Sequence, residues 1–342
     1  MKTFVAAIRQ ALPEATLDND QLAAQFGSWS AEKILAKTGV RTRHIAAPDE
    51  CASDLAFRAA QKLLAETQFD PSQIDFLLHC TQTADYIMPT TACLLQNRLG
   101  LRTSCGALDF NLGCSGYIYG LGLSKALIES GQARSILLTT AETYSKLINP
   151  ADKSARTLFG DAATATLLTA NEKETLIGPF VYGTDGAGVK DIVIPTGGKR
   201  RSPVPNAELV VDDSGNGRTV NDFYMNGAEV FNFTLRTVPG AVEELLQQAG
   251  VQKDDVDLFV FHQANAFMLD HLRRKLQIPA AKFVMAMEHV GNTVSSSIPI
   301  ALQCAAQRGL LQPDALVMLV AFGVGYSWAA TFIRWQPDTS CS

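Results

Sequence analysis

A single cysteine stands at a turn where its side chain could act as a nucleophile. Cys114 lies between Gly113 and Ser115, directly after an apolar run and directly before a long amphipathic segment. This order predicts a strand, a tight turn and a helix, with the cysteine at the helix N-terminus. The dipole and the unpaired N–H groups of a helix N-terminus favour the thiolate, the nucleophilic form of cysteine. We therefore expect Cys114 to have a lowered pKa and to be the reactive one among seven cysteines.

A histidine and an asparagine in the second half of the chain have side chains suited to binding an oxyanion. His262 follows an apolar run in "FVFHQAN", and Asn292 precedes another amphipathic segment in "HVGNTVSSSIP". Both can donate N–H bonds to one oxygen and so stabilise the enolate of a thioester. The three residues predict carbanion chemistry on a thioester beside a thiolate that holds an acyl group. The simpler alternatives are an inert buried thiol, a structural histidine and an asparagine that only caps its helix.

The composition argues against several other classes of protein. The net charge is −5 and charged residues make up 18% of the chain, which argues against a nucleic-acid-binding protein. No apolar run approaches the roughly 20 residues needed to cross a bilayer, and the first residues are too polar for a signal peptide. The odd number of cysteines and the absence of CxxC argue against a disulfide framework or a zinc site. We expect a cytoplasmic protein that binds no metal.

The two halves of the sequence resemble each other. The stretch "LLAETQFDPSQIDFLLHCTQTADY" matches "LLQQAGVQKDDVDLFVFHQANAF", so that Asp75 corresponds to Asp257. The segment that begins with Cys114 matches the one that begins with Asn292. Each unit predicts strand, turn, helix and strand, which indicates a duplicated α/β fold with two mostly parallel sheets. The expected halves are residues 1–172, with the cysteine, and 173–342, with the histidine and asparagine.

Other elements that must position these side chains follow from periodicity and turn residues. The pattern predicts a first strand at the N-terminus and helices over 51–67 and 233–250, the second ending at Gly250. Continuous apolar runs predict buried strands over 134–143 and 315–325. Residues 196–221 are rich in Gly, Pro and Asp and predict a surface excursion.

Several motifs together resemble one known family. They are "DFNLGCSGYIYGLGLSKALI", "FGDAATATLL", "FVFHQAN", "HVGNTVSSSIPIAL" and "AFGVGYSW". In this order they resemble the 3-oxoacyl-(acyl carrier protein) synthase III branch of the thiolase superfamily. The resemblance implies a homodimer with a five-layered αβαβα fold and a Cys114–His262–Asn292 active site. It implies no cofactor other than substrates linked to CoA or phosphopantetheine, with acyl-CoA or an acyl carrier protein as partner.

The same resemblance assigns roles to individual residues. Cys114 would take an acyl group from a thioester, and His262 and Asn292 would assist decarboxylation of a malonyl thioester. The backbone N–H groups of Cys114 and Val324 would form the acyl oxyanion hole. Met88 would reach across the dimer into the partner's acyl pocket, Phe231 would line the pantetheine channel, and Asn265 would bind the substrate.

The sequence also departs from the family pattern at its entrance. Lys33 and Lys37 stand where the housekeeping enzyme has a tryptophan and an arginine that clasp the CoA adenine, and Lys153 replaces another arginine. Lysine cannot stack on a base. Phe267 replaces an arginine linked to carrier-protein docking, although three basic residues keep that helix positive: Arg273, Arg274 and Lys275. We therefore expect a specialised relative, in fatty acid or polyketide-type metabolism, that accepts a larger or carrier-bound acyl group.

Three other functions fit part of this pattern. A non-decarboxylating acyltransferase would move the acyl group from Cys114 to an alcohol or amine. A cysteine hydrolase would use Cys114 with His262, but Asn292 heads its own helix and is poorly placed to orient the imidazole. A catalytically inactive scaffold that binds a carrier protein would not need all three residues.

Overall fold

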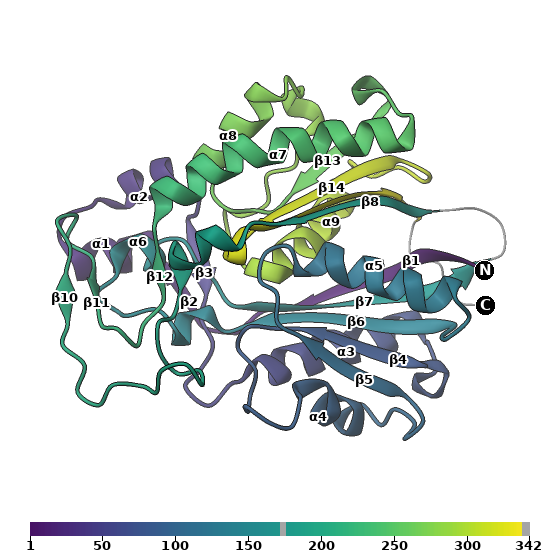
Figure 1. Ribbon diagram of the computed structural model, residues 1–342, viewed down its shortest axis with the longest axis horizontal. Helices are drawn as coiled ribbons and strands as arrows, with labels where there is room; N and C mark the ends of the chain where they lie inside the picture. Colours follow the sequence, from purple (N-terminus) through teal and green to yellow (C-terminus); the bar gives the residue numbers. More distant parts are fainter. Residues whose placement is uncertain (172–175, 337–342) are drawn as a thin grey trace.

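The chain folds into two β-sheets that alternate with three layers of helices (Figure 1). The computed structural model describes residues 1–171 and 176–336. The expected five-layered αβαβα architecture is confirmed. From one face to the other, the helix layers are α3 (Ala52–Thr67) with α4 (Thr91–Arg98), α5 (Gly116–Glu129) with α9 (Ser297–Gln307), and α7 (Gly227–Ala249) with α8 (Ala266–Lys275).

The two sheets share one strand order, as expected for a duplication. The first sheet runs β1 (Lys2–Ala11), β7 (Ala162–Asn171), β6 (Ser135–Glu142), β4 (Phe76–Cys80) and β5 (Gly106–Phe110). The second runs β8 (Ile177–Thr184), β15 (Ser327–Arg334), β14 (Leu316–Gly323) and β13 (Leu258–Phe261). The counterpart of β5 is reduced to a single bridge between Phe259 and Phe283. The expected boundary between the halves, at residues 172 and 173, touches residues outside the described part of the chain.

The expectation of mostly parallel sheets is wrong, because both sheets are mixed. In the first sheet β4 pairs in parallel with β5 and β6, whereas β7 runs antiparallel to β1 and β6. In the second, only β13 and β14 are parallel. Residues 324–326 join β14 directly to β15, and a connection this short permits only an antiparallel return.

The individual elements follow the sequence pattern closely. Helix α3 begins after Cys51, whose backbone N–H donates to Asp54 in a capping arrangement. Helix α7 starts earlier than expected, at Gly227, and ends as expected at Gly250, which adopts a φ of 65°. Strand β6 is buried along its whole length, as expected for a central strand.

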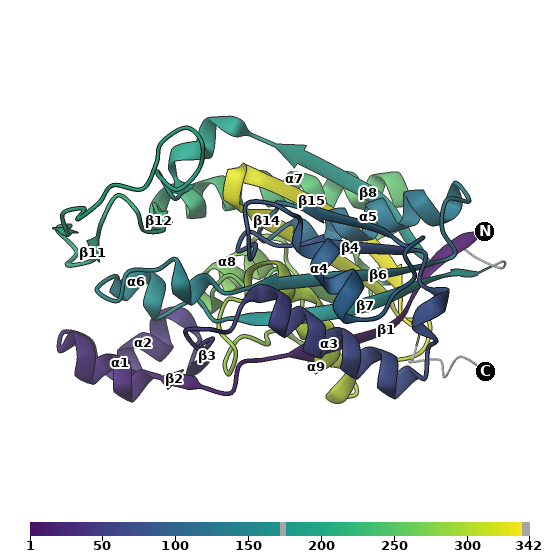
Figure 2. The ribbon, with the colours of Figure 1, turned by 90° about the horizontal axis from the view of Figure 1, so that it is seen from below.

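The short elements gather at one end of the molecule, away from the N-terminus (Figures 1 and 2). The expected excursion lies there, with the hairpin formed by β10 and β11. Among the described residues these elements are β2 (Thr16–Asp18), β3 (Thr42–His44), β9 (Ile192–Val193), β10 (Val210–Val211), β11 (Gly217–Arg218), β12 (Tyr224–Met225), α1 (Asn19–Phe26), α2 (Ala31–Thr38) and α6 (Lys153–Arg156).

The middle layer brings two helix starts to the same place. Helices α5 and α9 are apolar on most sides because both are packed between the sheets. Gly120 of α5 allows close packing, since a Cβ there would lie 2.6 Å from Leu138 Cδ1. The start of α5 contacts η6 (Val294–Ser296), the single turn that precedes α9. No helix in the described part of the chain is long and apolar enough to cross a membrane.

The repeated aspartates have the same structural role in both halves. The Asp75 carboxylate accepts from the backbone N–H of Arg134 (2.7 Å) and Ser135, and the Asp257 carboxylate accepts from that of Leu316 (2.8 Å). Each therefore joins the start of one central strand to the start of its neighbour.

Replacing Asp257 with alanine is expected to lower the free energy of unfolding by about 1–2 kcal/mol, because a charge-assisted hydrogen bond to the backbone is lost. Chemical denaturation of Asp257→Ala measures this. Asp254→Ala removes the same charge from the adjacent 3-10 turn (Lys253–Asp255) and should stay close to the parent protein. Equal losses in the two variants would contradict the assignment.

Candidate active site

The structure brings Cys114, His262 and Asn292 together as lining residues of one inner cavity. The cavity encloses about 80 Å³. Its remaining walls are mostly apolar and come from both halves of the chain, including Tyr144, Phe159, Met225, Val230, Met268, Phe322 and Val324. One small apolar chamber thus contains a thiol, an imidazole and a carboxamide.

Cys114 lies in the turn between β5 and α5, in tight contact with the opposite half. A Cβ added to Gly323 would lie 2.9 Å from Cys114 Sγ, so only glycine permits this approach. The next residue, Ser115, shares a 2.7 Å hydrogen bond with Ser327 Oγ. The end of β14 and the start of β15 therefore hold the cysteine turn from across the molecule.

His262 follows directly after β13 and is held in one orientation. Its backbone N–H donates to Val320 O (2.8 Å), and its Nδ1 is hydrogen-bonded to Ser297 Oγ (2.7 Å). Nε2 is therefore the ring nitrogen available to the cavity. Burial lowers the pKa of His262 to about 3, so the imidazole is neutral at physiological pH.

Asn292 lies in a strained turn that orients its side chain. Its Oδ1 accepts from the backbone N–H of Val294 (2.9 Å), which leaves the amide N–H₂ as the free donor. Val294 adopts a φ of 52°, a rare conformation for a β-branched residue and one that is concentrated at functional sites. Asn292 therefore forms a side-chain turn with Val294 at the start of η6 and does not cap α9, and this contact uses only the carbonyl oxygen.

The expected lowered pKa of Cys114 is wrong. Part of the residue is reachable through the cavity, but burial of the sulfur raises the pKa of the thiol to about 12, and the nearby Glu142 raises it further. Hydrogen bonding from the backbone of Cys114 and Val324 acts in the opposite direction and is the weaker effect. The apolar walls thus outweigh the helix N-terminus, and the resting site holds a neutral thiol beside a neutral imidazole.

Val324 occupies its turn without strain on its own backbone. Gly325, the following residue, takes the positive φ of 74°. The Val324 side chain packs directly against the backbone of Gly113. This is possible because Gly113 has no side chain: a Cβ there would lie 2.5 Å from Val324 Cγ1. The backbone N–H of Val324 faces the cysteine sulfur, the position required by the predicted oxyanion hole.

A wider outer cavity of about 630 Å³ adjoins the inner one. The two share Leu158, Gly227, Asn265 and Met268 as lining residues. Asn265 caps α8 by accepting from the Met268 backbone N–H (2.8 Å). Phe231 and Phe267 line the outer cavity with ring centroids 5.7 Å apart. Phe231 and Asn265 are thus placed where the sequence analysis expected substrate contacts, and Phe267 adds an aromatic surface.

Trp29 is a residue of the entrance that the sequence analysis missed. It lines the outer cavity, and the amino groups of Lys33, Lys37 and Lys153 lie 5.7, 4.6 and 5.6 Å from its ring centroid. An aromatic face surrounded by positive charge is therefore present near the expected adenine site. Its ring belongs to Trp29, which lies a few residues before Lys33 and Lys37. Trp29 precedes α2, whose N-cap is Ser30, and its position four residues before Lys33 in the sequence was the available signal.

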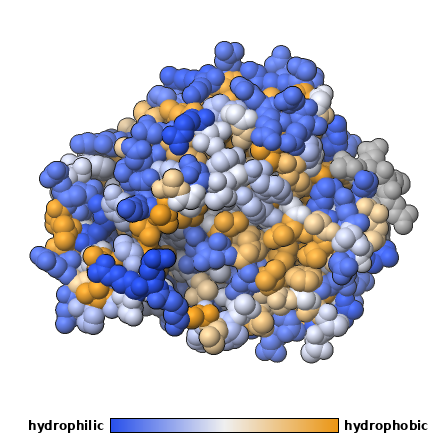
Figure 3. All heavy atoms as spheres, in the orientation of Figure 1, coloured by the Kyte–Doolittle hydropathy of each residue, from blue (hydrophilic) through white to orange (hydrophobic). Residues whose placement is uncertain are grey.

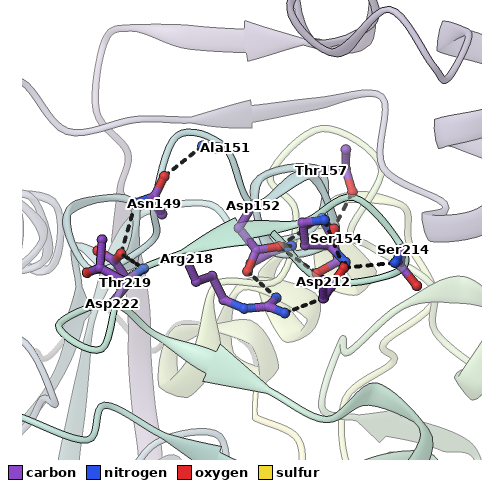
Figure 4. Close-up of polar contacts among 12 residues, drawn as sticks. Asn149, Ala151, Asp152, Ser154, Thr157, Asp212, Ser214, Arg218, Thr219 and Asp222 are labelled. Atoms are coloured by element: carbon purple, nitrogen blue, oxygen red, sulfur yellow. Dashed lines mark hydrogen bonds and ion pairs between the residues drawn. The ribbon is translucent and has the colours of Figure 1, made fainter. Parts of the chain in front are cut away.

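A partly buried ion-pair network anchors the excursion beside this entrance (Figure 4). Arg218 donates to Asp152 (2.8 Å), a buried residue that also caps α6, and to Asp212. After this anchor the chain reaches Phe223, which donates its backbone N–H to Leu147 O (2.8 Å) and lines the inner cavity. No residue of the excursion itself lines either cavity, but the segment that directly follows it supplies Phe223 and Met225 to the inner cavity and Gly227 to both.

The remaining predicted site residues lie outside the two cavities. On α8, Arg273 pairs with Asp270, and Lys275 donates to Leu235 O (2.8 Å). Arg274 also pairs with Asp270 (2.7 Å), with 73% of its side chain exposed, and Lys275 is exposed as well. Met88 is 79% exposed and does not line the cavity of its own chain.

No group of His, Cys, Asp and Glu suited to a metal ion occurs among the described residues, and Cys341 lies outside them.

Comparison with known proteins identifies the family. Residues 108–186 match the family model "3-Oxoacyl-[acyl-carrier-protein (ACP)] synthase III", and residues 246–335 match the model of its C-terminal region. The Caldanaerobacter subterraneus beta-ketoacyl-[acyl-carrier-protein] synthase III is 35% identical over 95% of both chains. The Bacillus subtilis synthase III 2 is 38% identical over 98% of this chain and 99% of its own. The chain belongs to the 3-oxoacyl-(acyl carrier protein) synthase III family.

Solved structures of family members agree with this result. A 3-oxoacyl-(acyl-carrier-protein) synthase III at 52% identity superposes with a TM-score of 0.96, covering 98% of this chain and 100% of its own. The Pseudomonas aeruginosa synthase III superposes at 33% identity with a TM-score of 0.86, covering 98% and 99%. The priming β-ketosynthase of the R1128 polyketide pathway does so at 27% identity with a TM-score of 0.85, covering 99% and 97%. Membership of the family makes the chain a transferase.

The rate of Cys114 alkylation by iodoacetamide is expected to rise about tenfold for each pH unit between about pH 6 and 7.5. Only the thiolate reacts, and the pKa of the buried thiol lies far above this range. Peptide mass mapping after timed labelling separates Cys114 from the other cysteines, with Cys114→Ser as the control. A rate that is already constant across this range would show instead that the helix N-terminus dominates the pKa.

Proposed function

We propose that this protein condenses an acyl thioester with a malonyl-type thioester, with loss of CO₂. The observation that supports this most strongly is the shared inner cavity, in which Cys114 faces two neutral N–H donors, His262 and Asn292. A hydrolase would need an imidazole that gains a proton easily, which burial of His262 opposes.

The first half-reaction transfers the acyl group to the cysteine. Cys114 Sγ attacks the thioester carbonyl, the C–S bond of the donor breaks, and the thiol proton passes to the departing sulfur. The oxyanion formed in between accepts from the backbone N–H groups of Cys114 and Val324. Because the resting thiol is protonated, the proton leaves only when the donor is bound, and the buried sulfur is protected from unspecific reaction.

The second half-reaction uses His262 and Asn292. Loss of CO₂ from the malonyl group leaves a carbanion whose enolate oxygen accepts from His262 Nε2–H and Asn292 Nδ2–H. This requires a neutral imidazole with its proton on Nε2, which is compatible with Nδ1 accepting from Ser297 Oγ–H. The carbanion then attacks the acyl-cysteine carbonyl, a C–C bond forms, and Cys114 leaves as a thiolate that regains its proton from water.

The entrance and the cavity suggest the kind of primer. Trp29 with its three lysines suits the aromatic base and phosphates of an acyl-CoA. The inner cavity is narrowed by three packed rings, Tyr144, Phe159 and Phe223, whose centroids lie 5.3–5.4 Å apart. We therefore propose a short acyl group as the primer, in place of the larger one expected from the sequence. The similarity to a priming polyketide synthase supports a role in specialised metabolism.

We also propose that the protein acts as a homodimer in the cytoplasm. Strand β5 is the last strand of its sheet and, among the described residues, pairs only with β4. Apolar side chains are exposed around this edge: Tyr86, Ile87, Met88, Leu108, Leu123 and Tyr182. Figure 3 shows apolar residues gathered over α5 and the nearby strands. Pairing of two β5 strands would cover this surface and bring the exposed Met88 of each protomer to the cavity of the other.

Asn292→Ala is expected to lower the rate of condensation about 10²-fold or more, because one of two donors to the enolate is lost. Acylation of Cys114 should change less than about threefold, since Asn292 does not serve the acyl oxyanion. Intact-mass analysis measures the acyl-enzyme, and released ¹⁴CO₂ measures condensation. Asn206→Ala, at an exposed turn, is the control. Product without CO₂ release in the parent protein would favour the non-decarboxylating acyltransferase.

Leu108→Arg is expected to convert the dimer to a monomer, because a charge would be buried where β5 meets its copy. Light scattering coupled to size-exclusion chromatography measures the mass. Val210→Arg changes a similarly exposed apolar residue on the excursion and should leave the dimer intact. A monomeric parent protein would contradict the proposed assembly.

A further inference from the structure

Glu142 is a buried carboxyl group for which the proposed mechanism has no use. It ends strand β6, and its side chain has no access to solvent. Among the described residues no lysine or arginine forms an ion pair with it. A buried carboxylate without a cation destabilises a protein unless other groups compensate for it, so its presence beside the cavity requires an explanation.

Hydrogen bonds from two separate loops converge on this carboxyl group. The backbone N–H of Gln82 donates to it at 3.1 Å and Thr83 Oγ1 at 3.3 Å, both from the loop after β4. Ser295 Oγ donates at 3.1 Å from the turn that begins with Asn292. Glu142 thus joins a loop of the first half to the Asn292 turn of the second.

The serine run after Asn292 makes this link part of a larger arrangement. Ser295 contacts Glu142, Ser296 Oγ contacts Thr140 Oγ1 (2.8 Å), and Ser297 Oγ contacts His262 Nδ1 (2.7 Å). Three consecutive serines therefore connect strand β6 to both residues that are proposed to bind the enolate.

The same carboxyl group lies close to the cysteine. The loop that it holds packs against the Cys114 turn, since a Cβ on Gly113 would lie 2.6 Å from Gln82 Oε1. Gln82 Oε1 in turn accepts from Tyr144 OH (2.6 Å), which lines the inner cavity. The ionisable groups that interact with Glu142 are Cys80 at the end of β4, Cys114 before α5, Tyr144 after β6 and Asp161 before β7.

We propose that Glu142 is a positioning residue that holds the Gln82 loop and the Asn292 turn together around Cys114, and that its negative charge acts on the cysteine sulfur. Its catalytic consequence rests on the proposed condensation, whereas its effect on the thiol does not. Burial raises the pKa of Glu142 to about 8. As the pH rises through this value the carboxyl group becomes charged, and the charge then opposes formation of the thiolate.

Glu142→Gln separates the effect of the charge from that of the side-chain shape. Iodoacetamide labelling of Cys114 in the full-length protein should be about three- to tenfold faster in this variant than in the parent near pH 9, which corresponds to a thiol pKa lower by about 0.5–1. Near pH 6.5, where the carboxyl group is protonated, the two should agree within about twofold. Glu129→Gln, at the far end of α5, is the charge control and should follow the parent throughout. Equal labelling of Glu142→Gln and the parent near pH 9 would overturn the inference.

Ser295→Ala removes the contact between Glu142 and the Asn292 turn, together with the Ser295 contact to Cys80. It should lower kcat for condensation about five- to tenfold, with KM for the acyl donor unchanged and labelling near pH 6.5 as in the parent. An unchanged kcat would overturn the positioning role. If the parent itself releases no CO₂ from a malonyl thioester, the proposed function fails, while the labelling profile of Glu142→Gln still decides whether this carboxyl group acts on the cysteine.

Discussion

The cavity around Cys114 depends on close contact between the two halves of the chain. The end of β14 reaches the cysteine turn only because Gly323 has no side chain, and the Ser115–Ser327 hydrogen bond holds the two segments together. This contact places the backbone N–H of Val324 against the sulfur. It also closes the chamber in which His262 and Asn292, both from the second half, face a nucleophile from the first.

Closing the chamber determines its electrostatics. Apolar walls raise the pKa of the cysteine and lower that of the histidine, so both are neutral before substrate binds. A neutral imidazole can donate to an enolate, and a protonated buried thiol needs no counter-ion. The proposed chemistry therefore develops its charges only on bound substrate, where oriented N–H donors replace water. Glu142 obeys the same rule below its pKa of about 8, and above that pH its charge acts on the cysteine.

The sequence and the structure agree best where a local sequence pattern is compatible with only one local structure. Asp75 and Asp257 were paired by the internal repeat, and the structure gives them one role at equivalent strand starts. The helix over 51–67 and the stop at Gly250 also follow from local periodicity and turn chemistry. The mixed parallel and antiparallel pairing could not be predicted in this way, because an apolar run indicates a buried strand but not the direction of that strand in the sheet.

The order of elements, the duplication and the identity of the three chemical groups were determined by the sequence, because each is recorded in residues that are close along the chain. The roles of these groups in catalysis remain predictions, supported by their meeting in one cavity. The tertiary structure alone decided the protonation of Cys114, the cluster of lysines around Trp29 and the position of Glu142. Each of these depends on distances and burial between segments far apart in sequence, and the free energy of a charge is set by all the groups that surround it.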